Sequence, residues 1–252
     1  MENYARFSKA SYEMVKSGDK NKRVNNINKS ISDTGFEVVP HLSNRDILYL
    51  KNDKTKEHHI AVRGTDASSR GLKKTQDVLT DVKFAMGQEA HDKHFNKKVN
   101  RINNLVKEVP SDYKLSLSGH SLGGGVVSEA LKKKQNVKNR VDEARTFNSA
   151  FSPFSSDPSK ATQKKLKDKV IHHRTRHDVV SASSMNHNKL GTVVEQESKD
   201  MKHIKYIPKP LQHAFESVDQ LRHHTIDQFI GPNEPVKHQI KPIKEEPKVL
   251  TK

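Results

Sequence analysis

Residues 115–125 contain a serine that is flanked by glycines, a pattern typical of a serine whose hydroxyl acts as a nucleophile. The run opens with leucines that alternate with serines, which is typical of a short buried strand. It ends in a Gly-x-Ser-x-Gly turn, and residues 126–131 then continue as a helix-compatible stretch. Glycines on both sides let the strand and the helix approach closely and leave the hydroxyl exposed at the top of a sheet. The pattern predicts Ser121 as a nucleophile, with the backbone N–H of Leu122 directed at an oxyanion formed above it.

A serine nucleophile needs a base, and the base needs a carboxylate that orients it. Around such a turn the acid follows the serine in the chain, and a histidine follows the acid. Asp178 is the preferred acid, because it lies in a predicted loop after the predicted strand at residues 170–171. Asp157 and Asp168 are less favourable, since the first lies next to a proline and the second precedes that strand.

The base is expected among the histidines that follow Asp178. Two of them lie where a predicted helix ends and residues 225–230 begin a new segment. His224 is preferred because it directly precedes that segment, and His223 remains the alternative. Of the others, His187 lies too near the acid and His203 lies in a predicted strand. His213 lies inside a predicted helix, and His238 lies in the tail.

A second oxyanion donor should come from a different strand end. Residues 58–63 form a predicted strand that stops at a Gly-Thr-Asp turn. The backbone N–H of Thr65 in this turn is expected to point toward Ser121.

Several elements are expected to position these residues. Residues 3–16 have near-helical apolar spacing, whereas residues 19–32 are polar and are predicted to form a loop. The strands at 35–39, 46–50 and 58–63 are joined by short turns and are predicted to be antiparallel. After residue 94, helices alternate with strands, which predicts parallel crossovers. The remaining predicted elements are a helix at 94–109, strands at 144–147 and 170–171, a hairpin of 191–194 with 203–207, and a helix at 210–221.

Length and composition fit one α/β domain of ordinary size or two small ones, and we expect one domain over residues 1–230 of the 252 in the chain. From Gly231 onward, prolines among lysines and glutamates predict a disordered tail, residues 231–252. The chain has no cysteine, no run of 18 apolar residues and no His-Glu-x-x-His, so neither a transmembrane segment nor a metal is expected. The N-terminus lacks the apolar region of a signal peptide, which favours an intracellular or virus-borne protein over classical secretion.

Three motifs together resemble the fungal-type (class 3) lipase family of the α/β-hydrolase superfamily. They are Ala61-Val62-Arg63-Gly64-Thr65, Asp77-Val78-Leu79-Thr80-Asp81 and Gly119-His120-Ser121-Leu122-Gly123-Gly124. The similarity covers about residues 4–230. It implies an α/β-hydrolase fold, with a mostly parallel central sheet flanked by helices and antiparallel strands at the N-terminal side.

The same resemblance implies an activity and a site. Family members cleave carboxylic esters of acylglycerols or phospholipids without a cofactor. The matching positions are Ser121 as nucleophile, Asp178 and His224 as its triad partners, and Thr65 and Leu122 as oxyanion residues. The expected activity is therefore that of a triacylglycerol lipase or phospholipase-type serine esterase.

The segment after the Arg-Gly-Thr turn departs from the family pattern. The lid there usually presents an apolar face to lipid, whereas residues 66–75 offer little beyond Ala67 and Leu72 among arginine and lysines. This composition argues against activation on neutral oil droplets. It favours docking on anionic bilayers, at ~1 kcal/mol per basic residue near the surface.

A second interpretation starts from the formal net charge of +16, which favours anionic partners. The chain would then be a catalytically silent hydrolase-fold protein that uses its basic surface for nucleic acid, anionic membrane or assembly. No nucleic-acid motif and no aromatic interleaving accompany its best basic patch, so nucleic acid is not supported by a motif. That patch is Lys160, Lys164, Lys165, Lys167, Lys169, Arg174 and Arg176.

Overall fold

The computed structural model describes residues 1–16, 18–65, 93–151, 156–176, 178, 181, 190–197, 224–231 and 239–241. Several predicted features lie outside these residues. They are the polar segment 66–75, the motif at 77–81, the strand at 203–207, the helix at 210–221, most of the tail and the alternative base His223.

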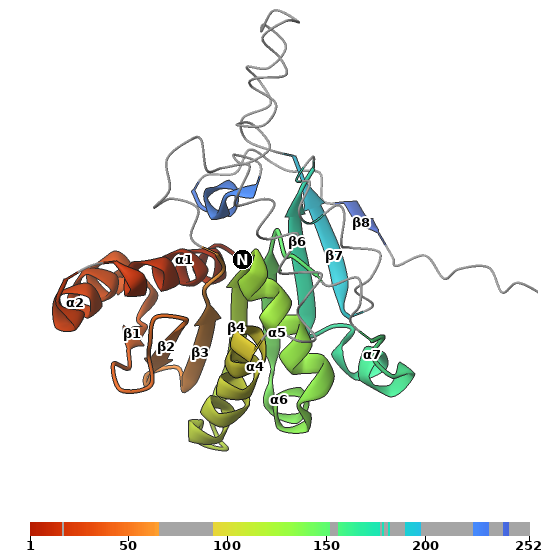
Figure 1. Cartoon of the computed structure of the whole chain (residues 1–252), viewed down its shortest axis with the longest axis horizontal. Coiled ribbons are helices and arrows are strands. Elements are labelled where there is room, and N and C mark those ends of the chain that lie inside the picture. Colours follow the sequence, from red (N-terminus) through yellow and green to blue (C-terminus); the bar gives the residue numbers. More distant parts are fainter. Residues whose placement is uncertain are drawn as a thin grey trace, which may run out of the picture.

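The strands of the described residues form one sheet whose spatial order follows the chain from β1 to β8 (Figure 1). β1 and β2 pair antiparallel, as do β2 and β3, while β3 to β7 are all parallel neighbours. This arrangement confirms the predicted mostly parallel sheet with antiparallel strands at the N-terminal side. The strands are β1 (Glu37–Val38), β2 (Ile47–Asn52), β3 (Glu57–Val62), β4 (Lys114–His120), β5 (Glu143–Phe147), β6 (Val170–Thr175), β7 (Thr192–Gln196) and β8 (Gln239–Lys241).

The last strand lies within the tail for which the sequence predicts no regular structure. β8 pairs antiparallel with β7, and Ile240 is the register partner of Val194. These three residues therefore continue the sheet beyond its parallel part.

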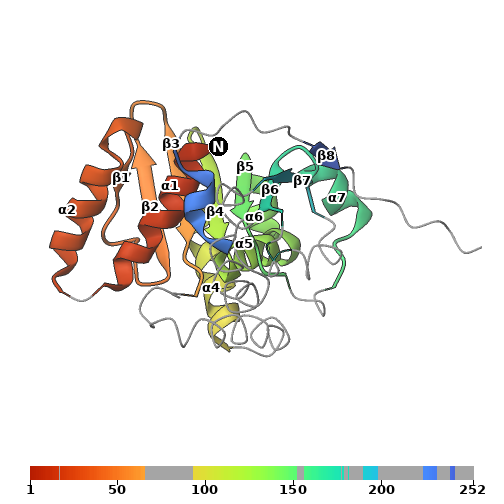
Figure 2. The ribbon, with the colours of Figure 1, turned by 90° about the horizontal axis from the view of Figure 1, so that it is seen from above.

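Helices cover both faces of the sheet. α2 lies at the β1 edge and α7 at the opposite edge (Figure 2). No helix among the described residues is long and apolar enough to cross a membrane. The helices are α1 (Glu2–Ala10), η1 (Ser11–Val15), α2 (Lys20–Ser30), η2 (Ser32–Thr34), α4 (Lys93–Leu105), η4 (Val106–Glu108), α5 (Leu122–Lys133), α6 (Gln135–Arg140), α7 (Lys160–Leu166) and η7 (Ile226–Phe229), where η marks a 3₁₀ helix.

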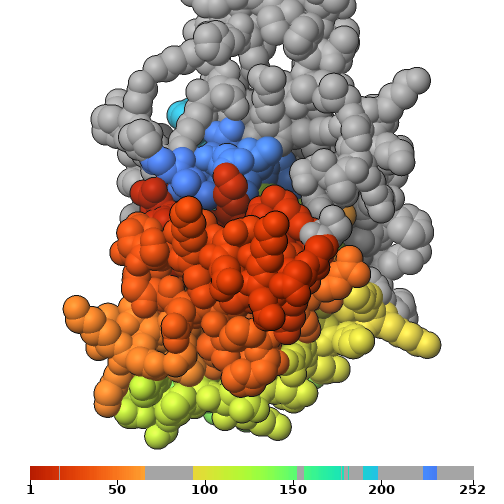
Figure 3. Space-filling view, turned by 90° about the vertical axis from the view of Figure 1, so that its left-hand side faces the viewer, coloured from red at the N-terminus to blue at the C-terminus, as the bar shows by residue number. Residues whose placement is uncertain are grey.

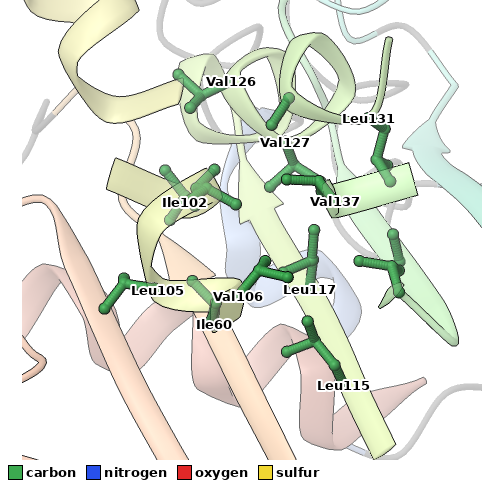
Figure 4. Close-up of a cluster of buried hydrophobic side chains, with 14 of the residues drawn as sticks. Ile60, Ile102, Leu105, Val106, Leu115, Leu117, Val126, Val127, Leu131 and Val137 are labelled. Atoms are coloured by element: carbon green, nitrogen blue, oxygen red, sulfur yellow. The ribbon is translucent and has the colours of Figure 1, made fainter. Parts of the chain in front are cut away.

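The larger hydrophobic core packs one face of the sheet against α4, α5 and α6. Ile60 of β3 and Leu117 of β4 meet Ile102 of α4 and Val127 of α5 (Figure 4). All four side chains are fully buried. The core is built by the alternation of side chains along each strand and by the apolar side chains of α4, which overlaps the helix predicted at residues 94–109.

The opposite face carries a second core beneath α1 and α2. The prediction of a polar loop over residues 19–32 is wrong, because residues 20–30 form α2. Asp19 caps this helix, and its carboxylate accepts a hydrogen bond from the backbone N–H of Lys22. Val24 and Ile27 lie three residues apart on one face and are buried against the sheet side chains of this core. Two apolar side chains at helical spacing thus attach to the core a helix whose other residues are polar.

The C-terminal segment 224–231 returns to the N-terminal helices. η7 lies against α1 (Figure 3), and Phe229 packs on Phe147 with ring centroids 5.0 Å apart. The ammonium group of Lys9 pairs with the carboxylate of Asp227 at 2.6 Å. The N-terminal helix α1 and the segment 224–231 therefore meet beside the carboxyl ends of β4 and β5.

Replacing Ile27 with alanine tests the packing of α2. We expect Ile27→Ala to lower the free energy of unfolding by about 2–4 kcal/mol, because it removes buried methyl groups and leaves a cavity. Asn26→Ala, at an exposed position of the same helix, should change it by less than about 0.5 kcal/mol. Urea unfolding of the three proteins measures both values, and equal effects of the two substitutions would contradict a packed α2.

Candidate active site

The site is built on a sharp turn between β4 and α5. Ser121 has φ 55° and ψ −128°, a backbone conformation that residues other than glycine rarely adopt. A β-carbon on Gly123 would collide with the carbonyl oxygen of Val62, and one on Gly119 would collide with the backbone of Gly123. Only glycines allow α5 to come this close to β3 and β4. The turn therefore presents the Ser121 side chain at the carboxyl end of the parallel strands.

Three side chains form a continuous hydrogen-bonded chain at this point. The hydroxyl oxygen of Ser121 lies 2.8 Å from Nε2 of His224. Nδ1 of the same ring lies 2.9 Å from Oδ1 of Asp178. With a proton on Nδ1, the imidazole accepts from the serine and donates to the carboxylate. This arrangement can make a serine hydroxyl nucleophilic.

Asp178 is fully buried, and its carboxylate is held from two sides. Oδ2 accepts a hydrogen bond from the backbone N–H of Ser181 at 3.0 Å, while Oδ1 faces His224. Burial acts to raise the pKa of Asp178, but the positive charge of protonated His224 and the hydrogen bonds from His224 and Ser181 outweigh it. The pKa therefore lies below its ordinary value, and the carboxylate stays ionised.

Backbone hydrogen bonds connect the serine turn to the end of β5, and the side chain of Asn148 connects that end to β6, the strand before the acid. The N–H of Ser121 donates to the carbonyl of Phe147 at 3.0 Å, and the N–H of Ala150 donates to the carbonyl of Ser121 at 3.1 Å. Asn148 lies between them with φ 41°, and its Oδ1 accepts from the backbone N–H of Thr175 at 2.8 Å. Thr175 ends β6, three residues before Asp178. Asn148 thus links the end of β5, which binds the Ser121 turn, to the end of β6, which leads to Asp178. A single asparagine after the predicted strand at 144–147 does not indicate this role.

The two predicted oxyanion residues belong to two different segments that adjoin Ser121. Leu122 is the first residue of α5, so its N–H has no acceptor within the helix. The turn that contains Thr65 packs directly on the serine, because a β-carbon on Gly64 would lie 3.1 Å from Cβ of Ser121. Asp46 anchors this turn through an ion pair with Arg63 at 3.3 Å.

The other candidates from the sequence are placed elsewhere or lie outside the described residues. Asp168 precedes β6 and is therefore at the opposite end of the parallel strands from Ser121. His187, His203, His213, His223 and His238 are not among the described residues. Within the described ranges, no group of three or more histidine, cysteine, aspartate or glutamate side chains could hold a metal ion.

The lowered pKa of Asp178 predicts a specific pH dependence of stability. The folded protein binds this proton less tightly than the unfolded chain, so the carboxylate stabilises the fold above the ordinary aspartate pKa near 4. That contribution is lost as the pH falls through the lower, folded value. We expect the difference in unfolding free energy between wild type and Asp178→Asn to shrink from about pH 6 to about pH 3, since asparagine does not titrate. Urea unfolding across this range measures the difference, and a constant value would contradict the assignment.

Comparison with known proteins places the chain in a family. No curated protein sequence matches it. The solved structures similar to it include Lip2 lipase from Yarrowia lipolytica, with 16% identity over 78% of this chain and 77% of the lipase and a TM-score of 0.47. They also include the native lipase–propeptide complex of Rhizomucor miehei, with 14% identity, coverages of 80% and 68% and a TM-score of 0.43. For lipase II from Rhizopus niveus the identity is 14%, the coverages are 78% and 80%, and the TM-score is 0.42.

The family model described as phospholipase-like, Tle-like phospholipase domain, matches residues 4–211. This range contains the serine turn, the Arg-Gly-Thr turn and Asp178, and it agrees with the lipase resemblance of the sequence motifs. Because the match spans most of the chain, the chain belongs to the family of Tle-like phospholipase domains.

Proposed function

We propose that this protein is a serine hydrolase that cleaves acyl esters of lipids through Ser121, His224 and Asp178. The observation that carries the proposal is the hydrogen-bonded chain from the Ser121 hydroxyl through both nitrogens of His224 to a buried carboxylate. Membership of a phospholipase-like family supports the lipid ester as substrate. The strained backbone of Ser121 supports the role of nucleophile, because such strain recurs where a serine must be presented at a sharp turn.

In the first half of the reaction, Oγ of Ser121 attacks the acyl carbonyl carbon while Nε2 of His224 accepts the hydroxyl proton. Asp178 holds the ring in orientation and stabilises the imidazolium that forms. The backbone N–H groups of Leu122 and Thr65 stabilise the oxyanion. The ester C–O bond then breaks, and the alcohol leaves with the proton from His224. The acyl group remains on Ser121.

In the second half, a water molecule gives a proton to Nε2 of His224 and attacks the acyl carbonyl. The second tetrahedral intermediate uses the same oxyanion donors. Its collapse releases the fatty acid and returns the proton to Oγ of Ser121. No cofactor enters either half of the cycle.

The match to a phospholipase-like family favours phospholipids as the substrates of this protein. The resemblance of its motifs to those of class 3 lipases makes acylglycerols the alternative. The net charge of +16 favours an anionic bilayer over a neutral oil droplet as the surface on which the enzyme works. Vesicles of anionic phospholipid, vesicles of neutral phospholipid and triglyceride emulsions therefore form the substrate panel.

Replacing the nucleophile tests the proposal. We expect Ser121→Ala to lower kcat for a soluble short-chain ester by roughly 10⁴-fold or more, and Ser121→Ala with His224→Ala to be no worse than either change alone. A fluorophosphonate probe should label wild type at Ser121 and leave Ser121→Ala unlabelled. Initial-rate kinetics and mass spectrometry of the labelled peptide measure these outcomes.

Ser128→Ala is the matched control, because Ser128 is a buried serine on α5 that takes no part in the proposed reaction. It should retain the activity and labelling of wild type. A folded wild type that neither hydrolyses any ester of the panel nor reacts with the probe would contradict the proposal. Salt-sensitive binding of DNA or anionic vesicles by such a protein would support the catalytically silent alternative.

A further inference from the structure

The residue before the serine makes a second connection to His224. His120 ends β4, and its Nε2 lies 2.6 Å from the backbone carbonyl oxygen of His224. A carbonyl oxygen only accepts, so Nε2 of His120 must be the donor. The two imidazole rings also contact each other, with centroids 5.0 Å apart at an interplanar angle of 40°. His224 is therefore held at its ring by Ser121 and Asp178 and at its backbone by His120.

A tyrosine from the N-terminal region holds His120 in this orientation. The hydroxyl of Tyr12, in η1, lies 2.8 Å from Nδ1 of His120. In a neutral imidazole with its proton on Nε2, Nδ1 is an acceptor, so the tyrosine hydroxyl donates to it. The two bonds fix the tautomer and the rotation of the ring together.

The same hydroxyl lies over the Arg-Gly-Thr turn. A β-carbon on Gly64 would approach Oη of Tyr12 to 2.7 Å and would also collide with the carbonyl oxygen of His120. Tyr12 and His120 therefore occupy the point where the serine turn, the Thr65 turn and the His224 segment meet. Three distant parts of the chain therefore contact this pair.

Burial keeps the His120 ring uncharged. It is 7% exposed. Desolvation, and after it repulsion from a charged His224, lowers the pKa of His120 to about 3. The His224 carbonyl, Asp178 and Asp227 act in the opposite direction, but their effects on this pKa are smaller. A neutral ring can donate to the carbonyl without opposing the positive charge that His224 carries during the proposed reaction.

We propose that His120, oriented by Tyr12, is a positioning residue that holds the backbone of His224 so that its ring bridges Ser121 and Asp178. This inference rests on the proposed function for its catalytic meaning, although the geometric claim can be tested separately. His120 does not touch the reacting atoms and acts only through His224.

The test compares His120→Phe, His120→Gln and Tyr12→Phe with wild type. Phenylalanine keeps a ring but removes the donor, whereas glutamine retains an N–H at a similar distance from the backbone. Because a misplacement near 1 Å can cost about 100-fold, we expect His120→Phe to lower kcat for a soluble ester by roughly that factor with little change in KM. His120→Gln should recover most of this loss, and Tyr12→Phe should show a smaller loss of the same kind.

A second readout does not depend on turnover. We expect the proton between Nδ1 of His224 and Asp178 to give a downfield NMR resonance, which His224→Gln identifies by its loss. His120→Phe should shift or broaden this resonance, and His120→Gln should restore it. If wild type shows no esterase activity, the proposed function is wrong. The effect of the His120 variants on this resonance still tests whether His120 positions His224.

His172→Phe is the matched control. His172 is another buried histidine whose Nε2 donates to a backbone carbonyl, that of Leu190 at 2.9 Å, and whose Nδ1 lies 2.7 Å from Oγ1 of Thr146 on β5. It should destabilise the protein without shifting the His224 resonance or kcat. The inference is overturned if His120→Phe and Tyr12→Phe leave the resonance unchanged, or if His120→Gln is as impaired as His120→Phe. Should His120→Phe not fold, Tyr12→Phe and His120→Gln decide the question.

Discussion

The close approach of α5 to the sheet is the constraint on which the site depends. A helix can begin directly above β3 and β4 only where no side chain separates it from the strands, and the glycines at 119 and 123 meet that condition. The consequence is a strained Ser121, whose φ is positive and whose backbone is held by hydrogen bonds from both sides. The strain persists because the packing of α5 against the core over-determines the turn. A looser helix would relieve the strain and lose the presentation of the hydroxyl.

The other two members of the hydrogen-bonded chain reach Ser121 by different physical routes. Asp178 arrives through parallel strand order, because β4, β5 and β6 end at the same edge and Asn148 joins the ends of β5 and β6. His224 arrives through docking of a C-terminal segment on α1, where Phe229 supplies apolar contact and Asp227 pairs with Lys9. The first route depends on the sheet, and the second depends on the N-terminal helix. The site therefore needs the whole domain to fold around it.

The parts of the site that follow local patterns could be predicted from the sequence. The serine turn is marked by its glycines, and Asp178 follows a recognisable strand, so chain order alone restricts the candidates. The helix at residues 20–30 could not be predicted from its apolar pattern, because Val24 and Ile27 are its only apolar residues among asparagines and lysines. The single capping residue, Asp19, is too weak a signal to predict a helix by itself. The contacts of His120 with Tyr12 and His224 span 108 and 104 positions in the chain. No spacing rule connects such distant residues, although His120 lies inside the motif itself.

The N-terminal helices are part of the candidate site rather than an addition to the sheet. Tyr12 reaches the residue next to Ser121, and Lys9 reaches the segment that begins with His224. The exposed ion pair between Lys9 and Asp227 contributes little by itself, because exposed pairs are screened by solvent. The buried contacts beside it, from Phe147 and Phe229, supply the apolar area that holds the segment in place. The hydrogen bond from His120, whose ring Tyr12 orients, then fixes the backbone of that docked segment at His224. Apolar packing thus brings His224 to the sheet, and the hydrogen bond from His120 to its backbone carbonyl determines which way its ring faces.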